Sequence, residues 1–168
     1  MKSILIYFDL RKYGYIEKNK NKEETLDILS FLHTKIEDYM IKLKAEIYKV
    51  QTDTAVYIIK GDYCKDIDYE LLELKNIIDG GMFERGLPSK IHICVIIEEC
   101  YSGIIKTNTK EYFNVFGPLM NKLEKVIYIV ENIEDNETKE GIIILKGILL
   151  NCTIKKEIKQ LGEELYLI

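Results

Sequence analysis

The sequence predicts an α+β fold: a mixed sheet covered by helices, close to the ferredoxin-like βαββαβ arrangement. Three observations support this. A short and almost wholly apolar run opens the chain, stretches with helical spacing of apolar residues alternate with β-rich stretches, and two β-rich stretches are separated only by a short turn. The expected order of elements is therefore β-α-β-β-α-β-α-β.

The first strand is expected over Ser3 to Leu10 (SILIYFDL), because a nearly continuous apolar run is typical of a central strand buried on both faces. It carries a carboxylate near its end, Asp9. A helix is expected from Glu24 to Lys44, where leucine, isoleucine and methionine recur at intervals of three and four. The charged run before it, Glu17 to Glu24, is interpreted as a solvated loop, and His33 as a structural or surface residue.

Two strands are expected next, AEIYKV and TAVYIIKG, on either side of Thr52-Asp53. A second helix is predicted from Tyr69 to Ile78, with Gly80-Gly81 as its stop. The run KIHICVIIEE predicts a fourth strand.

The remaining segments complete the expected order. The stretch GIIKTNTKEYFNVFG is interpreted as a loop or short strand, and Pro118 suits the start of a third helix. The runs EGIIILKGILL and EELYLI are expected to be further strand or mixed segments.

Length and composition restrict the class of protein. The 168 residues fit one domain spanning 1–168. The net charge of −4, with both signs interspersed, shows no basic stripe, so no nucleic-acid partner is expected. The four cysteines are scattered without a CxxC pair, and no signal peptide or membrane span is found, so a cytoplasmic protein without a membrane partner is expected. Phosphate-binding glycine loops and Gly-x-Ser-x-Gly elbows are missing from the sequence.

Two aspartates suggest a metal site. If the first strand and the hairpin lie side by side, Asp9 and Asp53 converge. Together with a backbone carbonyl such as that of Leu10, they offer oxygen ligands suited to Mg²⁺ or Mn²⁺ bridging a triphosphate. Taken alone, an aspartate at a hairpin tip such as Asp53 is usually only a turn residue.

Four segments together resemble the class III nucleotidyl cyclases, the adenylate and guanylate cyclase family, over nearly the whole chain. They are YFDL, YKVQTDTAVYII, LPSKIHICVIIEECYSGII and YFNVFGPLMNKLEKV. The resemblance implies that Asp9 and Asp53 are metal ligands. In the last segment Gly117 and Asn121 match the family pattern, and Lys125 stands where the family has arginine.

The resemblance also implies roles for further residues. Asn121 would orient the ribose and Lys125 would meet the phosphate charge. Lys49 and Asn114 occupy the two base-reading positions, and Lys159 loosely matches a lysine that holds the terminal phosphates.

The implied activity is conversion of a nucleoside triphosphate to its 3′,5′-cyclic monophosphate with Mg²⁺ or Mn²⁺. In the family two chains pair head to tail and share each site, so a homodimer is expected. The chain departs from the family pattern at Thr52, which replaces glycine, at Lys125, and at Asn114, which replaces aspartate. Lys49 with Asn114 leaves adenine, guanine and pyrimidines open, and the branch that makes cyclic pyrimidine nucleotides in antiphage defence is one candidate.

Three possibilities stay open from the sequence alone. The chain is either an enzyme or a degenerate cyclase-fold module that dimerises, binds nucleotide without turnover and acts in regulation. A ferredoxin-like domain of unrelated function is the third possibility.

Overall fold

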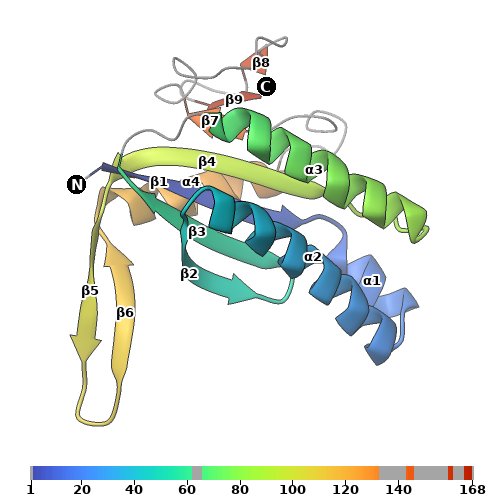
Figure 1. Ribbon diagram of the computed structural model, residues 1–168, viewed down its shortest axis with the longest axis horizontal. Coiled ribbons are helices and arrows are strands. Elements are labelled where there is room, and N and C mark those ends of the chain that lie inside the picture. Colours follow the sequence, from blue (N-terminus) through green and yellow to red (C-terminus); the bar gives the residue numbers. More distant parts are fainter. Residues whose placement is uncertain (1, 62–65, 133–142, 146–158, 161–164, 168) are drawn as a thin grey trace.

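The computed structural model describes residues 2–61, 66–132, 143–145, 159–160 and 165–167 (Figure 1). Its elements are β1 (Lys2–Leu10), α1 (Tyr13–Asn19), α2 (Lys22–Lys42), β2 (Glu46–Gln51), β3 (Thr54–Lys60), α3 (Ile67–Glu84), β4 (Ile91–Glu99), β5 (Tyr101–Lys106), β6 (Glu111–Phe116), α4 (Pro118–Asn132), β7 (Ile143–Leu145), β8 (Lys159–Gln160) and β9 (Leu165–Leu167). Among these described elements no helix is both long and apolar enough to cross a bilayer.

The main sheet has the strand order β2-β3-β1-β4-β7-β9-β8. Strand β1 lies between β3 and β4 and is antiparallel to both, whereas β4 and β7 are parallel. This mixed sheet, with β1 central among the first four strands, confirms the predicted ferredoxin-like α+β fold.

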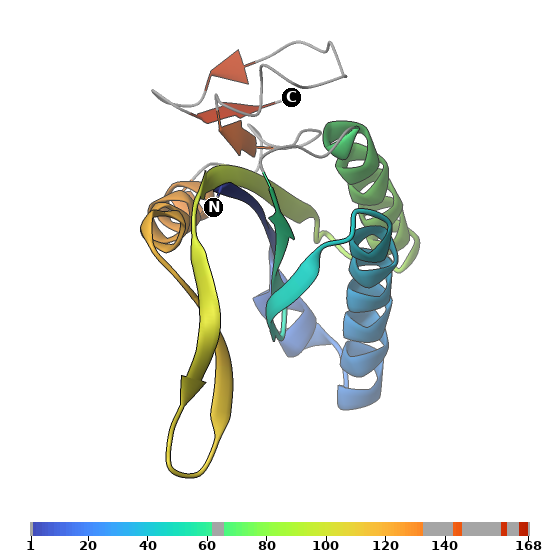
Figure 2. The same cartoon turned by 60° about the vertical axis from the view of Figure 1, so that its left-hand side comes forward.

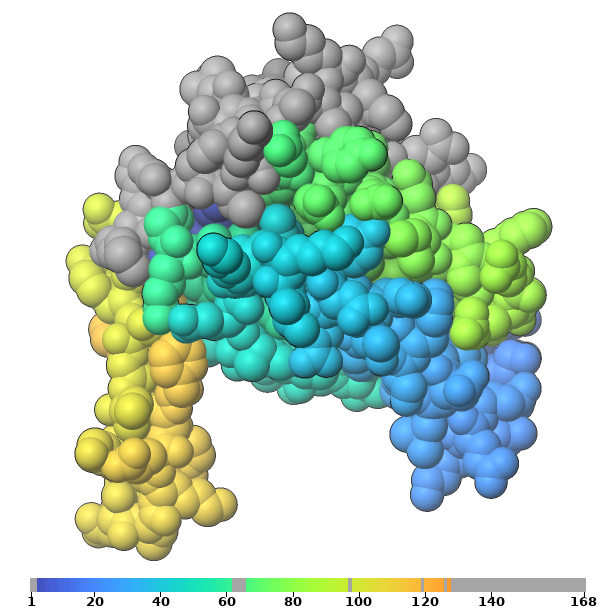
Figure 3. All heavy atoms as spheres, viewed as in Figure 1, coloured from blue at the N-terminus to red at the C-terminus, as the bar shows by residue number. Residues whose placement is uncertain are grey.

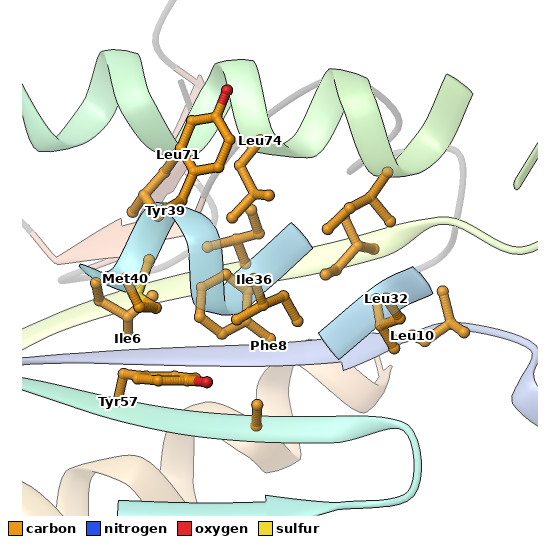
Figure 4. Close-up of a cluster of buried hydrophobic side chains, with 14 of the residues drawn as sticks. Ile6, Phe8, Leu10, Leu32, Ile36, Tyr39, Met40, Tyr57, Leu71 and Leu74 are labelled. Atoms are coloured by element: carbon orange, nitrogen blue, oxygen red, sulfur yellow. The ribbon is translucent and has the colours of Figure 1, made fainter. Parts of the chain in front are cut away.

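Alternation along β1 divides the core between the two faces of the sheet. Ile4, Ile6, Phe8 and Leu10 face α2 and α3 and belong to the larger core, which Figure 4 shows in close-up. The intervening residues Leu5 and Tyr7 face the opposite side, where a smaller cluster includes Leu123 of α4. Because both faces of β1 are covered, its sequence is apolar from Ile4 to Phe8.

Strands β5 and β6 form a separate two-stranded sheet that projects from the body as an arm (Figures 1 and 2). The loop or short strand expected in this stretch is in fact a pair of strands joined by a turn, so that prediction is only partly right. The turn at its tip is closed by the Thr107 amide, which donates to the carbonyl of Lys110 at 2.8 Å.

Two other local predictions are wrong. The run from Glu17 to Glu24 contains the end of α1 and the start of α2, where Asn21 and Glu24 form a reciprocal capping box. Helix α3 continues through Gly80 and Gly81. Gly81 serves close packing, because a Cβ there would clash with the ring of Phe31 on α2.

A buried ion pair fixes the start of β4. The Lys75 ammonium, only 1% exposed, donates to Asp79 and to the carbonyl of Ile91, each at 2.8 Å. The Asp79 carboxylate in turn accepts from the Ile91 amide at 2.8 Å. Both backbone groups of Ile91 are thus held by α3.

Lys75→Met is expected to lower the free energy of unfolding by about 3 kcal/mol, because it leaves Asp79 partly buried without its cation. Urea unfolding measures this. The matched control is Lys20→Met, which removes an exposed pair of the same spacing with Glu24 and should cost about 0.5 kcal/mol or less. Equal losses of unfolding free energy in both variants would show that the contacts of Lys75 with Asp79 and Ile91 stabilise the fold no more than an exposed ion pair does.

Candidate active site

Asp9 lies near the end of β1, on the face of the sheet that carries α4. It follows Leu5 and Tyr7 in the alternation and is 9% exposed. Its antiparallel partners are Thr54 on β3 and His92 on β4. The carboxylate is therefore held between two neighbouring strands at the end of the central one.

The hairpin between β2 and β3 brings Asp53 to the same end of β1. The Leu10 amide donates to the carbonyl of Asp53 at 2.9 Å, immediately beyond the last β1–β3 pair, Asp9 and Thr54. The predicted convergence of Asp9, Leu10 and Asp53 is confirmed at the level of the backbone. Their role as metal ligands stays a prediction.

His33 of α2 supports the hairpin tip. Its Nε2 lies 2.9 Å from the carbonyl oxygen of Thr52, and because a carbonyl only accepts, this nitrogen carries the proton. A helical residue 19 positions earlier in the chain thus holds the turn that presents Asp53. The sequence interpretation of His33 as structural or surface residue agrees with this contact but did not locate it.

Arg11 is a charged neighbour of Asp9 that the sequence analysis missed. Its Nη1 lies 3.4 Å from Oδ2 of Asp9. Next to it, burial and the negative charges of Glu17 and Asp53 raise the pKa of Tyr13. The site therefore combines negative charges near the hairpin with the Arg11 guanidinium beside Asp9.

The donor set fits a hard divalent cation. In the part of the chain that the structure describes, no group of three or more His, Cys, Asp or Glu side chains could hold a metal. Mg²⁺ is commonly bound by only one or two carboxylates together with substrate phosphates, so Asp9 and Asp53 suffice for that mode. Arg11 would have to exchange its contact with Asp9 for one with phosphate.

Lys49 reaches the α4 face of the sheet through a bulge in β2. The register shifts between Ile47 and Lys49, so that Lys49 pairs with Val56, whose side chain belongs to the smaller core. Tyr48, the bulged residue, packs against the same core. Both side chains consequently lie on the side of the arm.

Asn114 of β6 meets β2 across 66 residues of sequence. Its Oδ1 accepts from the Tyr48 hydroxyl at 3.3 Å and from the Val115 amide at 2.9 Å. The structure thus places Asn114 beside the residue that precedes Lys49, which agrees with the predicted pairing of Lys49 and Asn114. What they bind stays a prediction.

A cavity of about 250 Å³ lies at the root of the arm, between the arm, β2 and β3. Tyr48, Val115 and Ser3 are among its lining residues. Ser3 and Asp9 are six positions apart on β1, which corresponds to about 20 Å. The cavity is therefore remote from the two aspartates and adjacent to the Tyr48–Asn114 contact.

Asn121 and Lys125 lie on the exposed side of α4. Both are exposed, whereas Met120, Leu123 and Ile127 pack on the smaller core. Successive residues of an α-helix lie about 100° apart around its axis, so the two exposed residues lie on a different side of α4 from the three packed residues. The structure therefore turns Asn121 and Lys125 away from the sheet that carries Asp9 and does not bring them to the aspartates of the same chain.

Lys159 lies in β8, the edge strand of the main sheet, where it pairs with Leu167. On this side of the sheet β8 is the fourth strand from β1, after β4, β7 and β9. Its side chain, and with it the phosphate-binding prediction, lies outside what the structure describes.

No protein-family model matches the sequence, and no curated protein is similar to it. Solved structures are similar. The guanylyl cyclase Cya2 superposes with a TM-score of 0.71 at 15% identity, covering 99% of this chain and 90% of its own. The adenylyl cyclase CyaB from P. aeruginosa gives 0.70 at 14%, covering 99% and 92%.

The guanylate cyclase domain of RhGC from Catenaria anguillulae, in complex with GTP, gives a TM-score of 0.67 at 10% identity, covering 99% of this chain and 96% of its own. The similarity thus extends over at least 90% of each chain, although few residues are identical. The chain has the fold of the adenylyl and guanylyl cyclase catalytic domains.

Proposed function

We propose that the chain is a nucleotidyl cyclase acting as a homodimer with Mg²⁺ or Mn²⁺. The 3′-oxygen of the nucleoside triphosphate attacks the α-phosphorus and loses its proton, and the bond to the β-phosphate oxygen breaks to release pyrophosphate. Bound metal would neutralise charge on the triphosphate. The observation that most supports this proposal is that Asp9 and Asp53 lie at the same end of β1 in a chain with the cyclase fold.

Two features support a site shared between two copies. Asn121 and Lys125 face away from the aspartates of their own chain, so only another chain can bring them together. The arm also exposes large apolar side chains, a feature that marks interaction surfaces. They are Tyr101, Ile104, Ile105, Tyr112, Phe113 and Phe116, all at least 47% exposed, and Figure 3 shows the arm standing clear of the body.

The paired substitution Ile104→Asp and Phe113→Asp is expected to convert the dimer to a monomer, because the two residues are cross-strand neighbours on one face of the arm and charge there opposes burial. Sedimentation velocity measures this. The matched control, Lys106→Asp with Glu111→Lys, reverses an exposed ion pair on the same face and should leave the dimer intact. A dimer that survives the first pair would exclude the arm as its interface.

The function is tested by incubating the protein with ATP, GTP, CTP and UTP plus Mn²⁺ and detecting cyclic product by mass spectrometry. Cyclic UMP or CMP would also support the pyrimidine branch of the family. A folded protein that yields no product from any of the four would exclude the enzyme.

Two observations favour the second candidate, a regulatory module that binds nucleotide without turnover. Arg11 contacts Asp9, and Lys125 lacks the planar fork of arginine. Metal-dependent nucleotide binding without product would select this candidate.

A further inference from the structure

Asn114 has only hydrogen-bond donors left for a ligand. The Val115 backbone amide can only donate, so the atom 2.9 Å away from it must be the oxygen of the Asn114 side chain, which fixes the orientation of the amide. The Tyr48 hydroxyl donates to the same oxygen at 3.3 Å. Both lone pairs are then engaged, and the side-chain NH₂ makes no hydrogen bond within the described part of the chain.

Lys49 adds a second donor on the same face. An ammonium group donates and never accepts. Lys49 is exposed and forms no ion pair with any residue that the structure describes. The two predicted base-reading residues therefore present donors alone.

We propose that Tyr48 makes the site selective for bases with an exocyclic carbonyl, so that GTP and UTP are preferred over ATP and CTP. Guanine offers O6 and N7 as neighbouring acceptors and uracil offers O4, whereas adenine offers N7 beside an amino group and cytosine has an amino group in place of O4. An amino group would face donors and lose its hydrogen bond. The proposal rests on the proposed function, because that function gives Lys49 and Asn114 the base-reading role.

The test compares the efficiency of cyclisation, kcat/KM, for GTP with that for ATP, and for UTP with that for CTP. We expect each oxo base to be favoured by about tenfold or more. Equal efficiencies, or a preference for ATP and CTP, would overturn the selectivity while leaving the cyclase function intact.

Tyr48→Phe isolates the cause. Removal of the hydroxyl frees one lone pair of the Asn114 oxygen, so the oxo-to-amino ratio should fall about two- to tenfold with little change in thermal stability. Tyr69→Phe is the matched control, since Tyr69 lies on α3, away from the arm and β2, and is 57% exposed. An unchanged ratio in Tyr48→Phe would remove Tyr48 from the selection.

Asn114→Asp should reverse the preference, because a carboxylate only accepts. Binding of 3′-deoxynucleoside triphosphates, which cannot cyclise, measures the same ratios without turnover. If the protein makes no cyclic product but binds 3′-deoxy-GTP more tightly than 3′-deoxy-ATP, the proposed base selectivity is correct and the proposed cyclase activity is wrong. Equal binding would overturn the selectivity independently.

Discussion

Asp53→Asn is expected to lower the rate of cyclic-nucleotide formation by about a thousandfold or more while leaving the fold intact. Asparagine suits a hairpin turn as well as aspartate does, and the hydrogen bond between the Leu10 amide and the carbonyl of residue 53 uses backbone atoms only. The substitution therefore removes charge and little else. Neutralisation of phosphate charge by metal is worth several kcal/mol, and each 1.36 kcal/mol is about tenfold in rate.

The measurement is the initial rate of product formation at saturating nucleotide and Mn²⁺, with circular dichroism and thermal unfolding as tests of the fold. Asp9→Asn should behave in the same way. Asp38→Asn is the matched control, because Asp38 is an exposed aspartate on α2. An Asp53→Asn variant that keeps more than about a tenth of the activity would exclude Asp53 as an essential metal ligand.

The predictions near β1 succeeded because the signals there are local or follow from pairing rules. A nearly continuous apolar run identifies a central strand. Once β1 is central and the next two strands form a hairpin, antiparallel pairing brings Asp53 to the end of β1 that carries Asp9. The backbone arrangement of the site therefore follows from the sequence alone.

The arm could not be predicted in the same way. Its strands expose aromatic and branched side chains on both faces, so their sequence lacks the alternation of polar and apolar residues that marks a half-buried strand. Such a pattern makes physical sense only if another surface covers the arm. The prediction that the helix stops at Gly81 failed for a related reason, because the small size of Gly81 serves a contact with Phe31, which is distant in sequence.

Contacts between distant segments account for the residues that were missed. Tyr48 meets Asn114, and His33 meets Thr52, only because β2 is bulged and α2 covers the sheet beside the hairpin. Nothing in the local sequence distinguishes these side chains from surface residues. They determine how the predicted residues are presented, which is the part of the site that a motif alone does not contain.

Mixing two inactive variants is expected to restore activity if each site is shared between chains. Asp53→Asn loses the metal side of the site but keeps α4, whereas the double variant Asn121→Ala with Lys125→Ala loses α4 but keeps both aspartates. Each variant alone should be inactive. In a mixed dimer, the aspartates of the second variant face the intact α4 of the first, so one of the two sites is whole.

Random reassociation makes half of the dimers mixed, and half of the sites in those dimers are intact, so about a quarter of the wild-type sites should return. Activity is measured after the two proteins are mixed, dissociated at low concentration and reconcentrated. The Asp53→Asn variant mixed with Asp9→Asn is the control and should stay inactive, because both changes affect the same half of the site. If the first mixture also stays inactive while mixed dimers form, Asn121 and Lys125 do not complete the site of a partner. The exposed side of α4 would then need another explanation.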